Sequence, residues 1–173
     1  MIQRNFWRNV LPSVIAFAFS GVYSIVDGMF VGQGVGDAGL AAINVAWPVT
    51  ALVQALGTGL GMAAAVVLSV CIGRRDAAEE HRALGSTAVL LLLAGVLSTA
   101  LLALLYRPLL PLLGAEGSVL AYADSYTRVI VLGSLFQVLG TGLVPLLRTY
   151  DGADAAMCSM TAGFLTNVVL DAL

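Results

Sequence analysis

Lysine is absent from this chain of 173 residues, and charge of either sign is scarce. All eight cationic side chains are arginines, and charged residues make up 10% of the sequence, whereas soluble globular domains carry about 25%. Nucleic-acid binding requires a clustered positive footprint, and the sequence has none, so no nucleic-acid partner is expected. With 60% hydrophobic residues, the chain has too little polar surface to cover a water-facing exterior.

Cysteine and histidine are also rare. Cys71 and Cys158 have no CxxC or Cys/His neighbour, which argues against a metal site and against a disulfide framework. His81 is the single histidine, and its position in a charged connector favours a solvated loop residue. No nucleophile–base arrangement is visible, so we predict that the protein is not an enzyme and that it uses no cofactor.

Long apolar runs dominate what is present. A membrane-spanning helix needs about 20 mostly apolar residues, and turn residues and charges divide this chain into five such stretches. The connectors between them, GQGVGDAG, GRRDAAEEHR, RPLLPLLGAEG and RTYDGAD, are short, and most mix glycine with charge as interhelical loops do. The sequence therefore predicts an all-α, polytopic membrane helix bundle whose five transmembrane helices cover residues 9–31, 40–71, 83–106, 119–147 and 155–173.

Arginine placement predicts how the helices are oriented. With alternating spans, six loop arginines fall on the side of the N-terminus and only Arg107 falls on the other side. The positive-inside rule then places the N-terminus in the cytoplasm of a multi-pass protein of the cell inner (plasma) membrane. The six arginines are Arg4, Arg8, Arg74, Arg75, Arg82 and Arg148.

Two acids interrupt the apolar stretches. Asp27 lies in the first and Asp171 in the fifth, and a carboxylate at the bilayer centre costs at least about 2.5–3.5 kcal/mol on insertion scales. Counted from the predicted helix starts at about 1.5 Å per residue, both lie about 25–27 Å from the cytoplasmic face, which is what one shared site requires. Asn167 precedes Asp171 by four residues and so lies on the same helix face. We predict a buried cation or proton site at Asp27, Asn167 and Asp171; the alternative is a polar pair that holds two helices together.

Other residues carry weaker signals. Asp124 and Arg128 are four apart, which favours a local ion pair. Tyr126, on the same turns, is a candidate for lining a cavity, with an interfacial aromatic residue as the alternative. Pro12 is a candidate bending point, because proline removes a helix hydrogen bond, although prolines are also ordinary in membrane helices.

Glycines recur every fourth residue at two places. Gly28, Gly32 and Gly36 form one series, and Gly57 and Gly61 form another. This small-xxx-small spacing predicts close approach of neighbouring helices. It is not a phosphate-binding loop, because no GxxxxGK[ST] motif and no preceding strand are present.

Taken together, several segments resemble the N-terminal lobe of multidrug and toxic compound extrusion (MATE) transporters, and the resemblance covers nearly the whole chain. The segments are LPSVIAFAFSGVYSIVDGMFVGQGVGDAGLAAINVAWPVT, GLGMAAAVVLSVCIGRRDAAEEHRALG, PLLPLLGAEGSVLAYADSYTRV, LLRTYDGADAAMCSM and TNVVLD. The resemblance implies a twelve-helix fold of two six-helix lobes around a central cavity. It also implies that a sixth helix and a C-terminal lobe are missing from this sequence.

In the DinF-like branch of that family, helix one carries an acid and helix five an Asn-x-x-x-Asp, which Asp27, Asn167 and Asp171 match. The resemblance implies that the two acids accept a proton or sodium ion and that Asn167 is a cation ligand or hydrogen-bond partner. The implied function is antiport that exports cationic or amphipathic small molecules in exchange for protons or sodium. A lipid-linked oligosaccharide flippase of related fold and a non-transporting membrane fragment are the alternatives; acids rather than cations in the spans disfavour the flippase.

Overall fold

Five α-helices make up the part of the chain described by the computed structural model, which covers residues 2–150 and 152–171. Their bounds match the five predicted stretches, and the first four helices extend further at both ends because helical turns continue into the connectors. The all-α prediction is confirmed. The helices are α1 (Ile2–Gly34), α2 (Asp37–Arg74), α3 (Ala77–Leu112), α4 (Gly117–Thr149) and α5 (Ala153–Asp171).

The short connectors reverse the chain through specific backbone conformations. Gly36 ends the first connector with φ of +78°, a region that glycine enters without a steric penalty. In the second connector, Arg75 adopts the left-handed conformation, and the N–H of Asp76 donates to the Cys71 carbonyl at 3.1 Å. The Asp76 carboxylate then caps α3 by accepting from the Glu79 N–H at 3.1 Å. These turns let consecutive helices run antiparallel.

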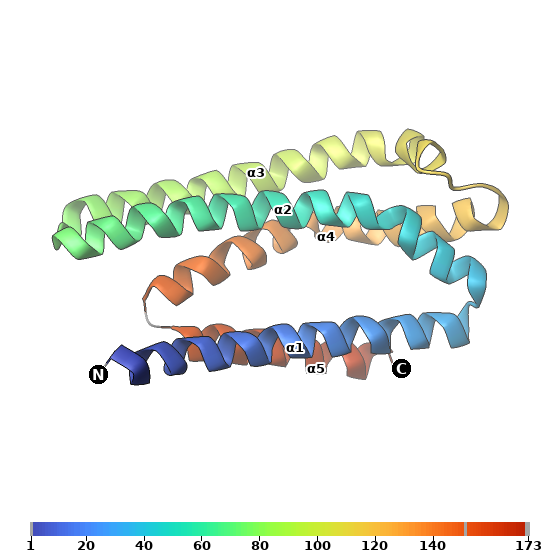
Figure 1. The fold of residues 1–173 in the computed structure, drawn as a ribbon. Coiled ribbons are helices and arrows are strands. Elements are labelled where there is room, and N and C mark those ends of the chain that lie inside the picture. The colour runs from blue at the N-terminus through green and yellow to red at the C-terminus, as the bar shows by residue number, and fades with distance from the viewer. Residues whose placement is uncertain (1, 151, 172–173) are drawn as a thin grey trace.

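The helices form two groups (Figure 1). One group contains α2, α3 and α4, which pack against one another along most of their length. The other contains α1 and α5, which lie side by side. Within the described residues, the backbone of α1 otherwise approaches only α2, and that of α5 only α4. The first and fifth helices of the chain are therefore neighbours in space.

Glycines make the contact between α2 and α4 unusually close. A Cβ atom at Gly57 would lie 2.7 Å from the Val138 carbonyl oxygen and would overlap the Thr141 hydroxyl, and one at Gly61 would overlap the Gly142 backbone. The prediction of close approach at Gly57 and Gly61 is confirmed. Both contacts advance in the same chain direction, so α2 and α4 run parallel.

For the first glycine series, the described residues do not show the predicted close approach of helix backbones. Among these residues, a Cβ atom at Gly28 or Gly36 would meet nothing within 4 Å, and one at Gly32 would meet only the Leu40 side chain, at 3.3 Å. Gly36 serves the turn rather than a helix contact, because its positive φ begins α2. Spacing alone did not show which helix face is opposed by a neighbour.

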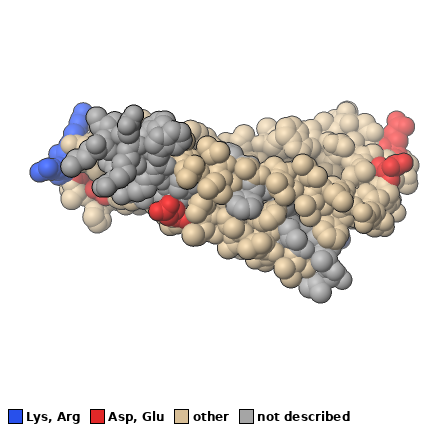
Figure 2. Space-filling view, turned by 60° about the horizontal axis from the view of Figure 1, so that its bottom comes forward, with Lys and Arg blue, Asp and Glu red and all other residues tan. Residues whose placement is uncertain are grey.

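The outer surface of the three-helix group is strongly apolar. Leu104, Leu112 and Phe136 are more than 70% exposed, and charged side chains on the face in Figure 2 gather toward its ends. By length and composition, α2, α3 and α4 can each cross a membrane. Such a surface is suited to hydrocarbon rather than water.

Candidate functional site

The helices that carry the predicted ion-site residues lie together. Asp27 is half-buried on α1, about two turns before the helix ends at Gly34. Asn167 and Asp171 belong to the last turns of α5, which runs alongside α1 (Figure 1). The side chains of Asn167 and Asp171 lie outside the described part of the structure. The fold thus brings the two helices together, and the predicted three-residue site stays a prediction.

A residue of a third helix approaches the same acid. Tyr126 of α4, 36% exposed, lies within electrostatic range of the Asp27 carboxylate. The α1 and α4 backbones are not in contact in the described residues, so the two groups come within this range without direct packing of their helices. A phenol can donate a hydrogen bond to a carboxylate. The arrangement therefore adds a neutral donor to the surroundings of Asp27.

Pro12, the predicted bending point, lies within the helical backbone of α1. Its side chain lies outside the described part of the structure. Prolines also occur inside the other long helices, at Pro48, Pro108, Pro111 and Pro145. The bend predicted at Pro12 stays a prediction.

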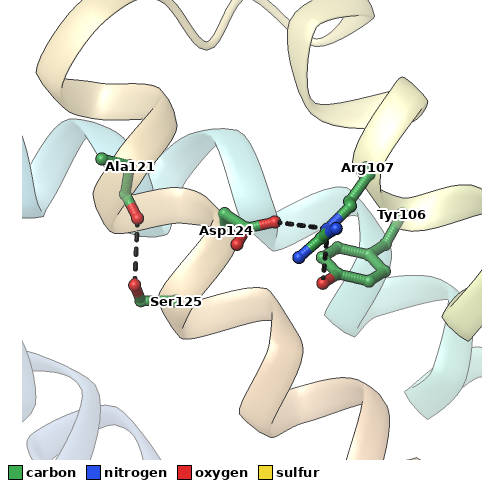
Figure 3. A network of polar contacts seen from close by, with 5 residues as sticks. All are labelled: Tyr106, Arg107, Ala121, Asp124 and Ser125. Carbon is green, nitrogen blue, oxygen red and sulfur yellow. Dashed lines mark hydrogen bonds and ion pairs between the residues drawn. The ribbon is translucent and has the colours of Figure 1, made fainter.

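A polar network closes the end of the bundle where α3 meets α4 (Figure 3). The Arg107 Nε lies 3.3 Å from Asp124 Oδ1 and 3.2 Å from the Tyr106 hydroxyl, and its guanidinium lies over the Tyr106 ring at 5.9 Å. The predicted Asp124–Arg128 pair is wrong, because the short turn between helices brings Arg107 to Asp124 instead. The three-dimensional path of the α3–α4 connector determines that Arg107, and not Arg128, pairs with Asp124.

A second polar contact joins α3 and α4 at the opposite end. The Tyr150 hydroxyl, just after α4, donates to Glu80 Oε1 at 2.5 Å. This hydrogen bond, aided by partial burial and by the carboxylate charge, raises the pKa of Tyr150 to about 12. Near it, a groove of about 420 Å³ has an almost wholly apolar lining made of Leu84, Thr87, Ala88, Leu143, Leu146, Leu147 and Tyr150.

Residues for a transition-metal site are not gathered in the described part of the chain. No group of three or more His, Cys, Asp or Glu side chains there could hold a metal ion. Cys71 is buried and Cys158 exposed, and both are free thiols. The side chains of Asn167 and Asp171, the predicted sodium ligands, are not among these described residues.

Comparison with known families decides the classification. The family model described as MatE matches residues 12–173. The chain belongs to the MatE family. This is a family of transporters and not of enzymes, which confirms the resemblance seen in the sequence and the prediction that the protein is not an enzyme.

The curated relatives of this MatE chain include proteins named as a multidrug export protein and as an FAD transporter. It is 28% identical over 162 residues to the multidrug export protein MepA of Staphylococcus aureus (strain MRSA252), covering 93% of this chain and 36% of the relative. It is 29% identical over 164 residues to an FAD transporter of Shewanella oneidensis, covering 94% of this chain and 36% of the relative. The chain thus spans about a third of the length of the curated relatives it matches.

Solved MATE structures share its fold. A crystal structure of MATE in complex with MaD3S is 29% identical, with a TM-score of 0.90 over 96% of this chain and 37% of that one. MATE in the bent conformation gives a TM-score of 0.88 at 29% identity, over 98% of this chain and 38% of that one. MATE in the straight conformation gives 0.89 at 28% identity, over 96% and 37%. The backbone resembles both conformations about equally.

Proposed function

We propose that this MatE chain is the ion-coupling lobe of a secondary active antiporter that exports cationic or amphipathic compounds. Family membership supports transport. The observation that carries the coupling proposal is the side-by-side packing of α1 and α5, since these two helices bear the acids of the membrane segments. A second lobe completes the substrate pathway in this proposal, because the curated relatives are about two and a half times as long.

The coupling site is formed by Asp27, Asn167 and Asp171, and the coupling ion is a proton or a sodium ion. Carboxylates inside a membrane protein face a partner or water, and both ions neutralise them. Neutralisation of Asp27 weakens its attraction for the Tyr126 hydroxyl and so changes how α1 lies against α4. An ion drives a conformational change only when its affinity differs between the two states, and this rearrangement supplies such a difference.

Pro12 absorbs the bend of α1 in this mechanism, because a proline lacks the N–H that would tie it to the preceding turn. Solved relatives are described in a bent and in a straight conformation. The N-terminus lies in the cytoplasm. In support, the exposed Arg74, Arg75 and Arg82 cluster at the α2–α3 end of the molecule, which is also the end where α4 finishes.

The test is Asp27→Asn in the complete protein, reconstituted in vesicles with an imposed proton or sodium gradient. Asparagine keeps the shape of the side chain and removes its titration and its charge. Efflux of a lipophilic cation should lose its dependence on the gradient. Asp37→Asn is the matched control, because Asp37 is exposed in the first turn of α2. Undiminished, gradient-dependent efflux by Asp27→Asn would overturn the proposal.

A further inference from the structure

Two glutamines lie deep in the membrane-spanning helices, away from the ion site. Gln54 is seventeen residues from the start of α2 and twenty from its end, and Gln137 is twenty residues from the start of α4 and twelve from its end. At about 1.5 Å per residue, each amide is at least about 18 Å from either end of its helix. An amide at that depth is unfavourable against lipid and needs a polar partner or water.

Both glutamines border the close seam between α2 and α4. Gln54 precedes Gly57 by three residues, and Gly57 packs against Val138 and Thr141. Gln137 precedes Thr141 by four residues, and its backbone carbonyl accepts the Thr141 hydroxyl at 2.8 Å. Since α2 and α4 run parallel here, the two amides are carried at about the same level of the bundle.

The helix positions also place both glutamines toward α1. On α2, the Leu40 side chain faces α1, since a Cβ atom added at Gly32 of α1 would contact it. Gln54 follows Leu40 by fourteen residues, which places it within about 40° of Leu40 around the helix axis. On α4, Tyr126 lies within electrostatic range of Asp27, and Gln137, eleven residues later, is within about 20° of Tyr126 around the helix. The glutamines therefore share the side of the bundle that faces the ion site.

Within the part of the chain that the structure describes, neither the Gln54 nor the Gln137 side chain makes a hydrogen bond, and Gln54 is exposed. On the same side of α4, a Cβ atom at Gly133 or at Gly140 would meet nothing within 4 Å among the described residues. Each amide keeps two N–H donors and a carbonyl acceptor for a bound molecule.

An aromatic ring completes this surface. Trp47 is 65% exposed and precedes Gln54 by seven residues, which places it on nearly the same face of α2 two turns away. An indole offers a flat apolar surface for a planar ring. Two amides that both donate and accept, near such a ring, suit a flat group that carries a carboxamide or similar donor–acceptor edge.

We propose that Gln54 and Gln137 form a neutral hydrogen-bonding subsite for the exported compound. The proposal rests on the transport function proposed above and narrows its substrate class. The subsite lies about 16 Å along α4 from Tyr126, at about 1.5 Å per residue. The preferred substrates then carry a carboxamide-like edge on a planar ring in addition to their apolar body and positive charge.

The experiment compares two cations that differ in one group. The cations 1-(naphthylmethyl)-3-carbamoylpyridinium and 1-(naphthylmethyl)pyridinium share the charge and the aromatic body, and only the first carries a carboxamide. Their affinities for the complete, detergent-purified protein are measured by competition with radiolabelled tetraphenylphosphonium. Wild type should bind the carboxamide compound about five- to tenfold more tightly, as expected for a hydrogen bond made to otherwise unpaired amides.

The variants are Gln54→Met and Gln137→Met, because methionine keeps an unbranched chain of similar length and good helix propensity without hydrogen bonding. Each should reduce the preference to within about twofold and leave pyridinium affinity unchanged. Gln33→Met is the matched control, since Gln33 is exposed at the end of α1. Where a methionine variant fails to fold, as judged by its elution profile, the corresponding glutamate variant replaces it and should change affinity for the two cations unequally.

The outcomes separate the subsite from the coupling proposal. Equal affinity of wild type for the two cations, or a preference retained in both variants, would overturn the subsite and leave transport intact. Failure of wild type to bind any of the three cations would overturn the subsite together with the proposed substrate class. Asp27→Asn should keep the carboxamide preference, because that variant alters ion coupling and not the amides.

Discussion

The Tyr150 hydroxyl is hydrogen-bonded to the Glu80 carboxylate at 2.5 Å, and this contact joins the end of α4 to the first turn of α3. It raises the pKa of Tyr150 to about 12 from an ordinary value near 10. Because the folded-state pKa is higher, the neutral phenol favours the folded state. That stabilisation is fully present below about pH 10 and is lost as the pH rises toward 12.

We therefore expect one tyrosine of the folded protein to titrate near pH 12. Glu80→Gln should lower the pKa of Tyr150 toward 10, because the charged acceptor and its hydrogen bond are replaced by a neutral amide. Tyrosinate absorbance, recorded as a difference between each variant and Tyr150→Phe, measures it. Glu79→Gln is the control, since the Glu79 side chain takes no part in the contact. Identical titrations of Glu80→Gln and wild type would contradict the assignment.

Packing at Gly57 gives a prediction about stability. Gly57→Ala should destabilise the folded protein by about 1–3 kcal/mol, because the added methyl would meet the Val138 carbonyl and the Thr141 hydroxyl. Gly59→Ala, two residues away on the same helix, is the matched control. Its Cβ would meet nothing within 4 Å, so it should be neutral or stabilising by up to about 1 kcal/mol. Thermal unfolding in detergent compares the two, and equal effects would show that the seam is not tight.

A hydrogen bond between hydroxyls carries a third prediction. Ser134 is fully buried on α4, and its hydroxyl lies 2.7 Å from that of Thr99 on α3. Ser134→Ala should cost about 0.5–1.5 kcal/mol of stability, since it removes an interhelical hydrogen bond. Ser125→Ala should cost less, because Ser125 is exposed and bonds only its own helix at Ala121. A double-mutant cycle with Thr99→Val isolates the pair, and a coupling energy of zero would refute it.

Apolar length, together with the charges and turn residues between the stretches, was enough to predict the helices. Each stretch ends at residues with a physical reason to turn, such as Gly36 with its positive φ and Asp76 as a helix cap. The close contact of α2 with α4 at Gly57 and Gly61 could also be predicted, because these glycines are four residues apart and so lie on one face of the helix. Gly28 and Gly36 show the limit of that rule, since they share this four-residue spacing and a Cβ atom at either would meet nothing within 4 Å among the described residues.

Partners across helices could not be read from spacing. Asp124 has a candidate cation four residues away at Arg128, yet it pairs with Arg107, which only the path of the α3–α4 turn brings near. Tyr126 was a candidate for a cavity, but its approach to Asp27 depends on how α4 is rotated toward α1. The proposed cluster of Asp27, Asn167 and Asp171 rests on the family resemblance and on the α1–α5 pairing, and the efflux experiment with Asp27→Asn tests it.

Tyr126 supplies a final prediction, about coupling rather than stability. If its hydroxyl stabilises charged Asp27, Tyr126→Phe removes that donor and leaves the ring in place. The ion concentration that gives half-maximal efflux should then shift by about two- to tenfold, as expected for loss of one hydrogen bond to a charged group. Tyr122→Phe is the control, because Tyr122 lies one turn earlier on α4 and is 45% exposed. An equal shift in both variants, or none in Tyr126→Phe, would show that the approach of Tyr126 to Asp27 has no part in coupling.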